Sequence, residues 1–174
     1  MKKILAYDDA VDLLDADHKA VKQLFIDYQA LCDDGAPPIA KGPLAGKICQ
    51  ALSVHAQIEE EIFYPAVRAA IGDNALMDEA LQEHAEAKHL IARIQGMDAG
   101  QAGYDASVQQ LGKLIDQHVL EEREEVFLKA RNAALDLRGL ALPLYERKQQ
   151  LQRAAPPPKP AKSVKPAKPA KERA

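Results

Sequence analysis

Residues 48–62 read Ile-Cys-Gln-Ala-Leu-Ser-Val-His-Ala-Gln-Ile-Glu-Glu-Glu-Ile, and this stretch decides the fold. Its apolar side chains recur every three or four residues, which is the spacing of one face of an α-helix. His55 falls on that face, and Glu59 follows it by one helical turn, a rotation of only about 40°. The stretch therefore predicts a helix that directs a histidine and a carboxylate toward a protein core.

The same pattern returns further along the chain. One alignment repeats the stretch at an offset of 63 residues, and a second, at an offset of 66, relates the helix before it to a later helix. The aligned pairs are His55 with His118, Glu59 with Glu122, Tyr64 with Phe127, Arg68 with Arg131, Asp17 with Glu83, His18 with His84, and Lys22 with Lys88. The sequence thus predicts two helix pairs related by an approximate internal twofold axis.

Turn and capping residues set the expected helix boundaries. A first helix should run from about residue 11 to 32, a second should begin at Gly42-Pro43 and kink or end at Pro65, a third should follow the turn at 72–74, and a fourth should begin near residues 105–107. A further helical stretch, about 135–151, contains Gly139 and Pro143 and is expected to be broken. Long helices with short connections predict an all-α fold, an antiparallel up-down four-helix bundle with a shorter C-terminal helix.

Composition supports this fold class and divides the chain into parts. The 174 residues are 47% apolar and 28% charged, with no Trp and few aromatic residues, which favours packed helices over a sandwich or barrel. The net charge of −3 combines a body of −8 with a tail of +5 in the last 21 residues. We therefore expect three parts: the bundle at 1–131, a C-terminal helical segment at 132–153, and a disordered Lys/Pro/Ala-rich tail at 154–174.

The tail carries lysines at every third position, which are Lys159, Lys162, Lys165, Lys168 and Lys171. In a polyproline II conformation, with three residues per turn, they would form one cationic ridge. The tail is either a flexible solubilising segment or an electrostatic contact for nucleic acid, an acidic membrane or an acidic protein.

The chain shows no secretory signal pattern at its start and no apolar run long enough to span a membrane. Cys32 and Cys49 form no Cys-x-x-Cys motif, and we expect both to be buried thiols. A reducing, cytoplasmic location is the expectation.

The histidines indicate a metal site. His18, His55, His84 and His118 each take a core-facing position on a different helix, and buried imidazoles need partners for their ring nitrogens. Glu59 and Glu122 lie one turn beyond two of them, and a buried carboxylate needs a cation. Six such donors suit two metals that share bridging carboxylates, and mixed nitrogen and oxygen ligation suits iron, with manganese as the other choice.

Other candidates on these helices are less favoured. His89 is rotated by about 140° from His84 and so lies off the ligand face. The neighbouring acids Glu60, Glu61, Glu121 and Glu124 are expected to form solvated charged faces. Tyr28 and Tyr64 are candidate hydrogen-bond or redox partners of the metals, but packing is the favoured interpretation for both.

The series His18, His55-x3-Glu59, His84, His118-x3-Glu122, with Phe63-Tyr64-Pro65 after the first glutamate, resembles the hemerythrin-like (HHE cation-binding) family over roughly residues 8–131. The resemblance implies a four-helix bundle around a non-haem di-iron centre. It implies that the four histidines are terminal iron ligands and that Glu59 and Glu122 are bridging carboxylates.

The chain differs from the oxygen-carrying hemerythrins, which place two histidines four residues apart on the third helix and end in His-x4-Asp. Here Ala80 and Lys88 flank His84 at that spacing, and the last motif is His-x3-Glu. This pattern is similar to the bacterial and sensor branch, and one ligand fewer leaves a coordination position for water, dioxygen, nitric oxide or peroxide.

Three functions are compatible with the sequence. The first is a hemerythrin-like di-iron protein that binds or reacts with a small diatomic molecule or peroxide, in oxidative or nitrosative stress or in oxygen or iron sensing and handling. The second is a helical adaptor that acts through its basic tail, with a structural or degenerate metal site. The third is a di-iron peroxidase or oxidase; a binding protein is favoured over an enzyme.

Overall fold

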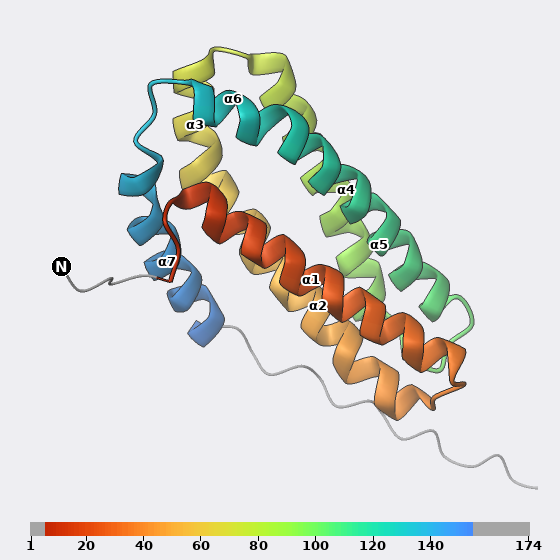
Figure 1. Ribbon diagram of the computed structural model, residues 1–174. Helices are drawn as coiled ribbons and strands as arrows, with labels where there is room; N and C mark the ends of the chain where they lie inside the picture. Colours follow the sequence, from red (N-terminus) through yellow and green to blue (C-terminus); the bar gives the residue numbers. More distant parts are fainter. Residues whose placement is uncertain (1–5, 155–174) are drawn as a thin grey trace, which may run out of the picture.

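The structure, a computed structural model, describes residues 6–154, and these residues form helices and loops without a β-strand (Figure 1). The expected disordered tail therefore lies outside the described residues, except for Ala154, which ends the last helix. The elements are α1 (Ala10–Asp33), α2 (Pro38–Ile58), η1 (Glu59–Phe63), α3 (Tyr64–Ile71), α4 (Asn74–Gly96), α5 (Tyr104–Glu121), η2 (Glu122–Phe127), α6 (Leu128–Asn132) and α7 (Leu137–Ala154). The all-α prediction is confirmed.

Four long helical rods make the bundle. α1 packs against α2 and α5, and α4 packs against α5 and α2, so that each rod has two neighbours. The rods α2-η1-α3 and α5-η2-α6 continue through their η segments without a loop, and α7 then lies across α1, α2 and η1 (Figure 1). The prediction of an antiparallel four-helix bundle with a shorter C-terminal helix is confirmed.

Aspartate and glycine residues cap the helices much as expected. Asp9 caps α1 by accepting a hydrogen bond from Asp12 N–H at 3.0 Å, and Asp73 caps α4 in the same way through Leu76 N–H at 3.1 Å. Gly72, with φ 69°, supplies the left-handed residue that ends α3. These caps fix the entry points of the two rods that carry His18 and His84.

Two predicted boundaries are wrong because proline acts differently by position. α2 begins at Pro38 rather than at Gly42-Pro43, since Pro37 is held extended before Pro38 and a proline at the first helical position costs no hydrogen bond. α7 is continuous rather than broken. Gly139 lies in its first turn, where its N–H donates to Asp136 Oδ1 at 2.9 Å, and the helix continues through Pro143.

The rod expected to kink or end at Pro65 instead runs on to Ile71. A π-helical segment, η1, precedes the proline, and the Tyr64 N–H reaches back to Glu59 O. The second π-helical segment, η2, contains no proline, so proline is not the common cause. Both π segments begin at a glutamate of the His-x3-Glu motifs, and such segments are frequent at functional sites.

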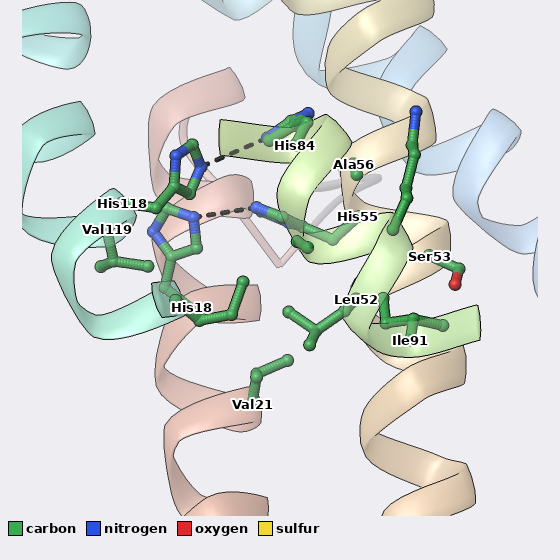
Figure 2. A pocket seen from close by; sticks show the side chains of 13 residues that line it. His18, Val21, Leu52, Ser53, His55, Ala56, His84, Ile91, His118 and Val119 are labelled. Atoms are coloured by element: carbon green, nitrogen blue, oxygen red, sulfur yellow. Dashed lines mark hydrogen bonds between the residues drawn. The ribbon is translucent and has the colours of Figure 1, made fainter. Parts of the chain in front are cut away.

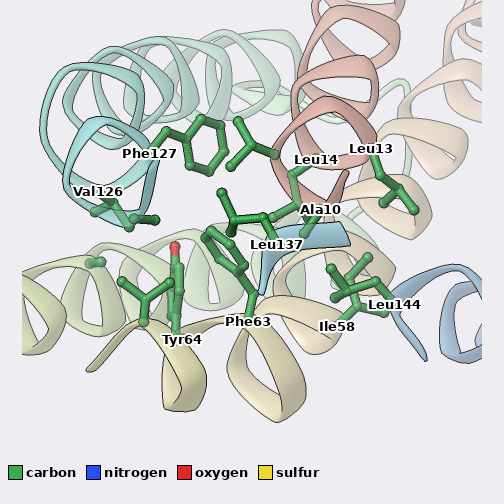
Figure 3. Packing of buried hydrophobic residues seen from close by; sticks show 14 of the residues in the cluster. Ala10, Leu13, Leu14, Ile58, Phe63, Tyr64, Val126, Phe127, Leu137 and Leu144 are labelled. Carbon is green, nitrogen blue, oxygen red and sulfur yellow. The ribbon is translucent and has the colours of Figure 1, made fainter. Parts of the chain in front are cut away.

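The core consists of two apolar clusters. One, nearer α7, contains Leu14, Ile58, Phe63, Val67, Phe127, Leu137 and Leu144 (Figure 3). The other, toward the opposite end, contains Val21, Tyr28, Ile48, Leu52, Ile91, Val108 and Leu111. Along each rod the core-facing histidine stands between residues of the two clusters, so a polar layer divides the apolar interior.

Two smaller observations concern the expected location. No helix among the described residues is long and apolar enough to cross a membrane. Both cysteines are free; Cys49 is buried as expected, whereas Cys32 is only partly buried.

Candidate metal centre

The structure brings the four predicted histidines together from four rods. His18 on α1 and His55 on α2 place their Nε2 atoms 2.8 Å apart, and His84 on α4 and His118 on α5 place theirs 3.2 Å apart (Figure 2). All four are nearly fully buried. The polar layer is therefore built of two imidazole pairs, one from each half of the repeat.

Glu59 and Glu122 join the two imidazole pairs. Glu59 Oε1 is 3.1 Å from His55 Nε2, and its Oε2 is 3.3 Å from His84 Nε2. Glu122 Oε2 is 3.2 Å from His18 Nε2 and 4.0 Å from His118 Nε2. The exposed fractions of the two carboxylates are 0% and 1%, so water does not compensate their charge.

Three further carboxylates, which sequence reasoning missed, face the outer ring nitrogens. Glu60 Oε1 is 2.9 Å from His84 Nδ1, Glu83 Oε2 is 2.6 Å from His118 Nδ1, and Asp17 Oδ2 is 3.6 Å from His55 Nδ1. The expectation of a solvated face is therefore wrong for Glu60. Asp17 and Glu83 directly precede His18 and His84 in the chain. This repeated acid-histidine pair is the sequence feature that could have indicated their role.

These outer carboxylates orient the imidazoles. A carboxylate at Nδ1 fixes the ring and turns the Nε2 lone pair inward, which is the arrangement found around protein-bound metals. Lys88 holds Glu60, and Lys148 on α7 holds Asp17. The inward direction of the Nε2 atoms is thus enforced from outside the site.

Tyr64 also reaches the site, which its interpretation as a packing residue did not anticipate. Its hydroxyl donates to Glu122 Oε1 at 3.0 Å and lies 3.2 Å from His84 Nε2. Burial and the nearby Glu122 carboxylate raise the pKa of Tyr64 well above its ordinary value, so the hydroxyl keeps its proton.

The electrostatics of the histidine and glutamate layer favour positive charge. Burial works against charge on His55, but Glu59 and Asp17 outweigh it and raise the pKa of His55 to about 10. Burial likewise works against charge on Glu59, but the nearby His55 and His84 hold its pKa well below the ordinary value. A proton on His55 therefore takes the place that a metal ion would fill, and the two compete.

The residues fit a metal site by two tests. Glu59 Oε1, Glu59 Oε2 and Glu122 Oε2 are buried without a hydrogen bond, and among residues 6–154 their ion pairs are with histidines alone. The spacings also fit, because neighbouring ligands that each lie about 2.1 Å from one ion are about 3 Å apart. Two donor sets result: His18, His55, Glu59 and Glu122; and Glu59, His84 and His118.

The remaining candidates lie elsewhere. His89 is exposed on α4, as expected from its rotation off the ligand face. Tyr28 is buried in the cluster away from the histidines and donates to Asp105 Oδ1 at 2.7 Å. Glu61 is bound by Arg147 on α7.

A small cavity lies against the histidine layer (Figure 2). Its volume is about 20 Å³, slightly more than the 10–15 Å³ or so that one water molecule needs. All four core histidines line it, together with mostly apolar side chains, among them Val21, Leu52, Ala87 and Ile91. The cavity therefore has room only for a very small molecule.

Comparison with known proteins gives consistent matches. The family model described as the hemerythrin HHE cation binding domain matches residues 9–130. A relative from Nostoc sp. described as a DNA nickase is 31% identical over 121 residues, which are 70% of this chain and 33% of the relative, so the chain spans about a third of that protein. The crystal structure of a hemerythrin HHE cation binding domain-containing protein from Mycobacterium kansasii shares the fold, with a TM-score of 0.71 and 19% identity over 84% of this chain and 88% of that one.

Proposed function

Because the chain belongs to the hemerythrin HHE cation-binding family, we propose that its bundle holds a non-haem di-iron centre that binds or reacts with dioxygen, nitric oxide or peroxide. The observation that carries the proposal is the convergence, in one buried layer, of four imidazole Nε2 atoms and two carboxylates whose ion pairs among residues 6–154 are with these histidines alone. Oxidative or nitrosative stress, or oxygen or iron sensing and handling, in the cytoplasm, is the corresponding cellular role.

The proposed ligands are the six residues predicted from the sequence, which are His18, His55, Glu59, His84, His118 and Glu122. Imidazole and carboxylate donors suit iron first and manganese second. Bound iron would supply redox chemistry and a coordination position for the small molecule.

The chain's own residues would prepare this chemistry. Glu60 and Glu83 hold the imidazoles of His84 and His118 with Nε2 inward, and the two apolar clusters exclude bulk water from the layer. The small apolar cavity admits a diatomic molecule more readily than a hydrated solute. The Tyr64 hydroxyl keeps a proton within reach of Glu122.

Metal analysis tests this function directly. Protein isolated without added metal should contain about two irons per chain, with ligand-to-metal absorption that responds to dioxygen, nitric oxide or peroxide after anaerobic reduction. His55→Ala should lose the metal and the absorption, whereas His89→Ala, which removes an exposed histidine of the same bundle, should retain both. Protein that remains metal-free after anaerobic reconstitution with ferrous iron would contradict the proposal.

An enzymatic variant of the proposal, a di-iron peroxidase or oxidase, uses the same site. Steady-state consumption of peroxide above the rate of free iron would support it. Binding of the small molecule without turnover would support the binding protein instead.

A second candidate function, an adaptor that acts through the basic tail, is favoured by the Nostoc relative and by the lysine spacing of the tail. We propose that the basic tail, residues 154–174, contacts nucleic acid, with an acidic membrane or an acidic protein as the other partners to test. Deletion of these residues should abolish a salt-dependent association with duplex DNA, since phosphate contacts release counterions. Glu122→Ala should leave that association unchanged.

A further inference from the structure

The two carboxylates of the metal layer are aligned by the repeat but are used differently. Glu59 divides its oxygens between the imidazole pairs: Oε1 faces His55 at 3.1 Å and Oε2 faces His84 at 3.3 Å. Glu122 presents only Oε2, which is 3.2 Å from His18 but 4.0 Å from His118. Glu59 is therefore placed to bridge two ions, whereas Glu122 lies closer to the His18–His55 position than to the His84–His118 position.

The cause of this difference is the residue that follows each glutamate by five positions. The Tyr64 hydroxyl donates a hydrogen bond to Glu122 Oε1, so that oxygen is engaged by the tyrosine and not by the imidazoles. The aligned residue in the other half is Phe127, which stacks on His18 with ring centroids 5.7 Å apart and has no polar atom to offer Glu59. Tyr64 is 2% exposed, so no bulk water competes with its hydrogen bond.

The consequence is an unequal pair of donor sets. Four residues, His18, His55, Glu59 and Glu122, surround one position, whereas three residues, Glu59, His84 and His118, surround the other. We propose that Tyr64 is a positioning residue that restricts Glu122 to the His18–His55 position and thereby makes the two metal positions unequal in affinity. This inference rests on the proposed metal pair.

Manganese(II) is a suitable probe because it is stable in air and its electron paramagnetic resonance spectrum distinguishes an isolated ion from a coupled pair. Metal-free protein titrated with Mn(II) should bind two ions in two steps, with the second about tenfold or more weaker, since the loss of even an outer partner of one ligand lowers metal affinity by about 10- to 100-fold. The first equivalent should show the spectrum of an isolated ion. Two equal steps in the wild-type protein would overturn the inference.

Tyr64→Phe gives the sharper result because the expected sign is unusual. Without the hydroxyl, Glu122 Oε1 becomes free to serve the His84–His118 position, so the second step should tighten toward the first by about tenfold. A variant that merely loosened the packing would weaken both steps. Tightening supports the inference, and an unchanged or weakened second step overturns it.

Phe127→Tyr is the matched variant from the other half. In the repeat, residue 127 is related to Glu59 as Tyr64 is related to Glu122, so the new phenol should donate a hydrogen bond to Glu59. Glu59 should then bridge the two ions less, and the magnetic coupling between the two Mn(II) ions should fall. Unfolding temperature measured without metal shows whether either variant folds; Phe127→Tyr tests the inference even where Tyr64→Phe does not. Failure of wild-type protein to take up any metal would instead contradict the proposed function itself.

Discussion

The two halves of the repeat carry the same ligands but support them differently. In the α4–α5 half, His84 and His118 each have a carboxylate at Nδ1, at 2.9 and 2.6 Å. In the α1–α2 half, Asp17 stands 3.6 Å from His55 Nδ1, and His18 Nδ1 is buried without a hydrogen bond. The repeat thus reproduces the inner donors and, in Asp17 and Glu83, one outer carboxylate per half, but not the close contact to Nδ1 in the first half and not a partner for His18 Nδ1.

A single aligned pair explains the missing support at His18. The residue aligned with Glu60 is Arg123, which turns outward and donates to Asp15 Oδ1 at 2.6 Å on the surface. His18 is instead fixed by stacking on Phe127. The aromatic contact is common to both halves, since the aligned Tyr64 lies against His84 with ring centroids 5.2 Å apart, so His18 lacks only the orienting carboxylate.

The added helix α7 also distinguishes the halves. It packs mainly on α1, α2 and η1, where Lys148 pairs with Asp17 and Arg147 Nε donates to Glu61 Oε2 at 2.6 Å. Lys148 holds the carboxylate that faces His55, as Lys88 holds Glu60, but Asp17 remains 3.6 Å from His55 Nδ1. The half with the weaker imidazole support is thus the half that α7 covers.

The largest expected effect separates the two glutamates. Glu59→Gln should remove both metal ions, with affinity reduced about 100-fold or more, because Glu59 faces both imidazole pairs. Glu122→Gln should leave one ion bound. Metal content by elemental analysis distinguishes the two, with Glu61→Gln on the same π segment as a control that retains both ions. Equal losses in the two variants would show that both glutamates bridge.

The next effect concerns the covering helix. Leu144 of α7 is fully buried in the apolar cluster that also contains Leu14 and Ile58. Leu144→Ala should therefore lower the free energy of unfolding by about 3 kcal/mol. Leu142, on the same helix but 42% exposed, should cost less than about 0.5 kcal/mol when changed to alanine. Urea denaturation of the metal-free variants measures both. Similar values for the two would mean that α7 does not pack against α1 and α2 in solution.

Periodicity and spacing predicted the all-α bundle and brought the six donors to one layer, because a helical face follows directly from residue positions. The outer carboxylates were missed because Glu60 belongs to a charged run that reads as surface, and its contact with His84 depends on the packing of α2 against α4. The π segments were missed because they change backbone hydrogen bonding without changing the apolar pattern. The start of α2 was wrong because two prolines, Pro38 and Pro43, fit a first turn equally well by sequence.

A smaller effect tests the unequal support of the imidazoles. Glu83→Gln should weaken metal binding by about 10- to 100-fold, since its 2.6 Å contact strengthens His118 as a donor. Asp17→Asn should weaken binding by less than about tenfold, because Asp17 is 3.6 Å from His55 Nδ1. Competition with a metal-chelating dye gives both affinities. A larger loss for Asp17→Asn would reverse the ranking of the two halves.

The smallest effect lies at the far end of the bundle, where Tyr28 in α1 is aligned with Ile94 in α4, so the phenol of Tyr28 has no counterpart at the aligned position. Tyr28 donates to Asp105, which also accepts a hydrogen bond from Lys41. Burial and Asp105 raise the pKa of Tyr28 far above its ordinary value of 10. The phenol of Tyr28 therefore stays neutral in the folded protein while it ionises in the unfolded protein. Its contribution to the free energy of unfolding is complete below pH 10 and is lost as the pH rises above 10.

Tyr28→Phe should therefore cost about 1 kcal/mol of unfolding free energy at pH 7. The difference from the wild-type protein should narrow between pH 10 and pH 11, at about 1.4 kcal/mol per pH unit at most. Urea denaturation of the metal-free protein at each pH measures this convergence. Tyr145→Phe is the control, because its phenol makes no hydrogen bond within residues 6–154. Parallel curves for Tyr28→Phe and the wild-type protein would mean that Tyr28 ionises equally in both states and that this end of the bundle does not distinguish the halves.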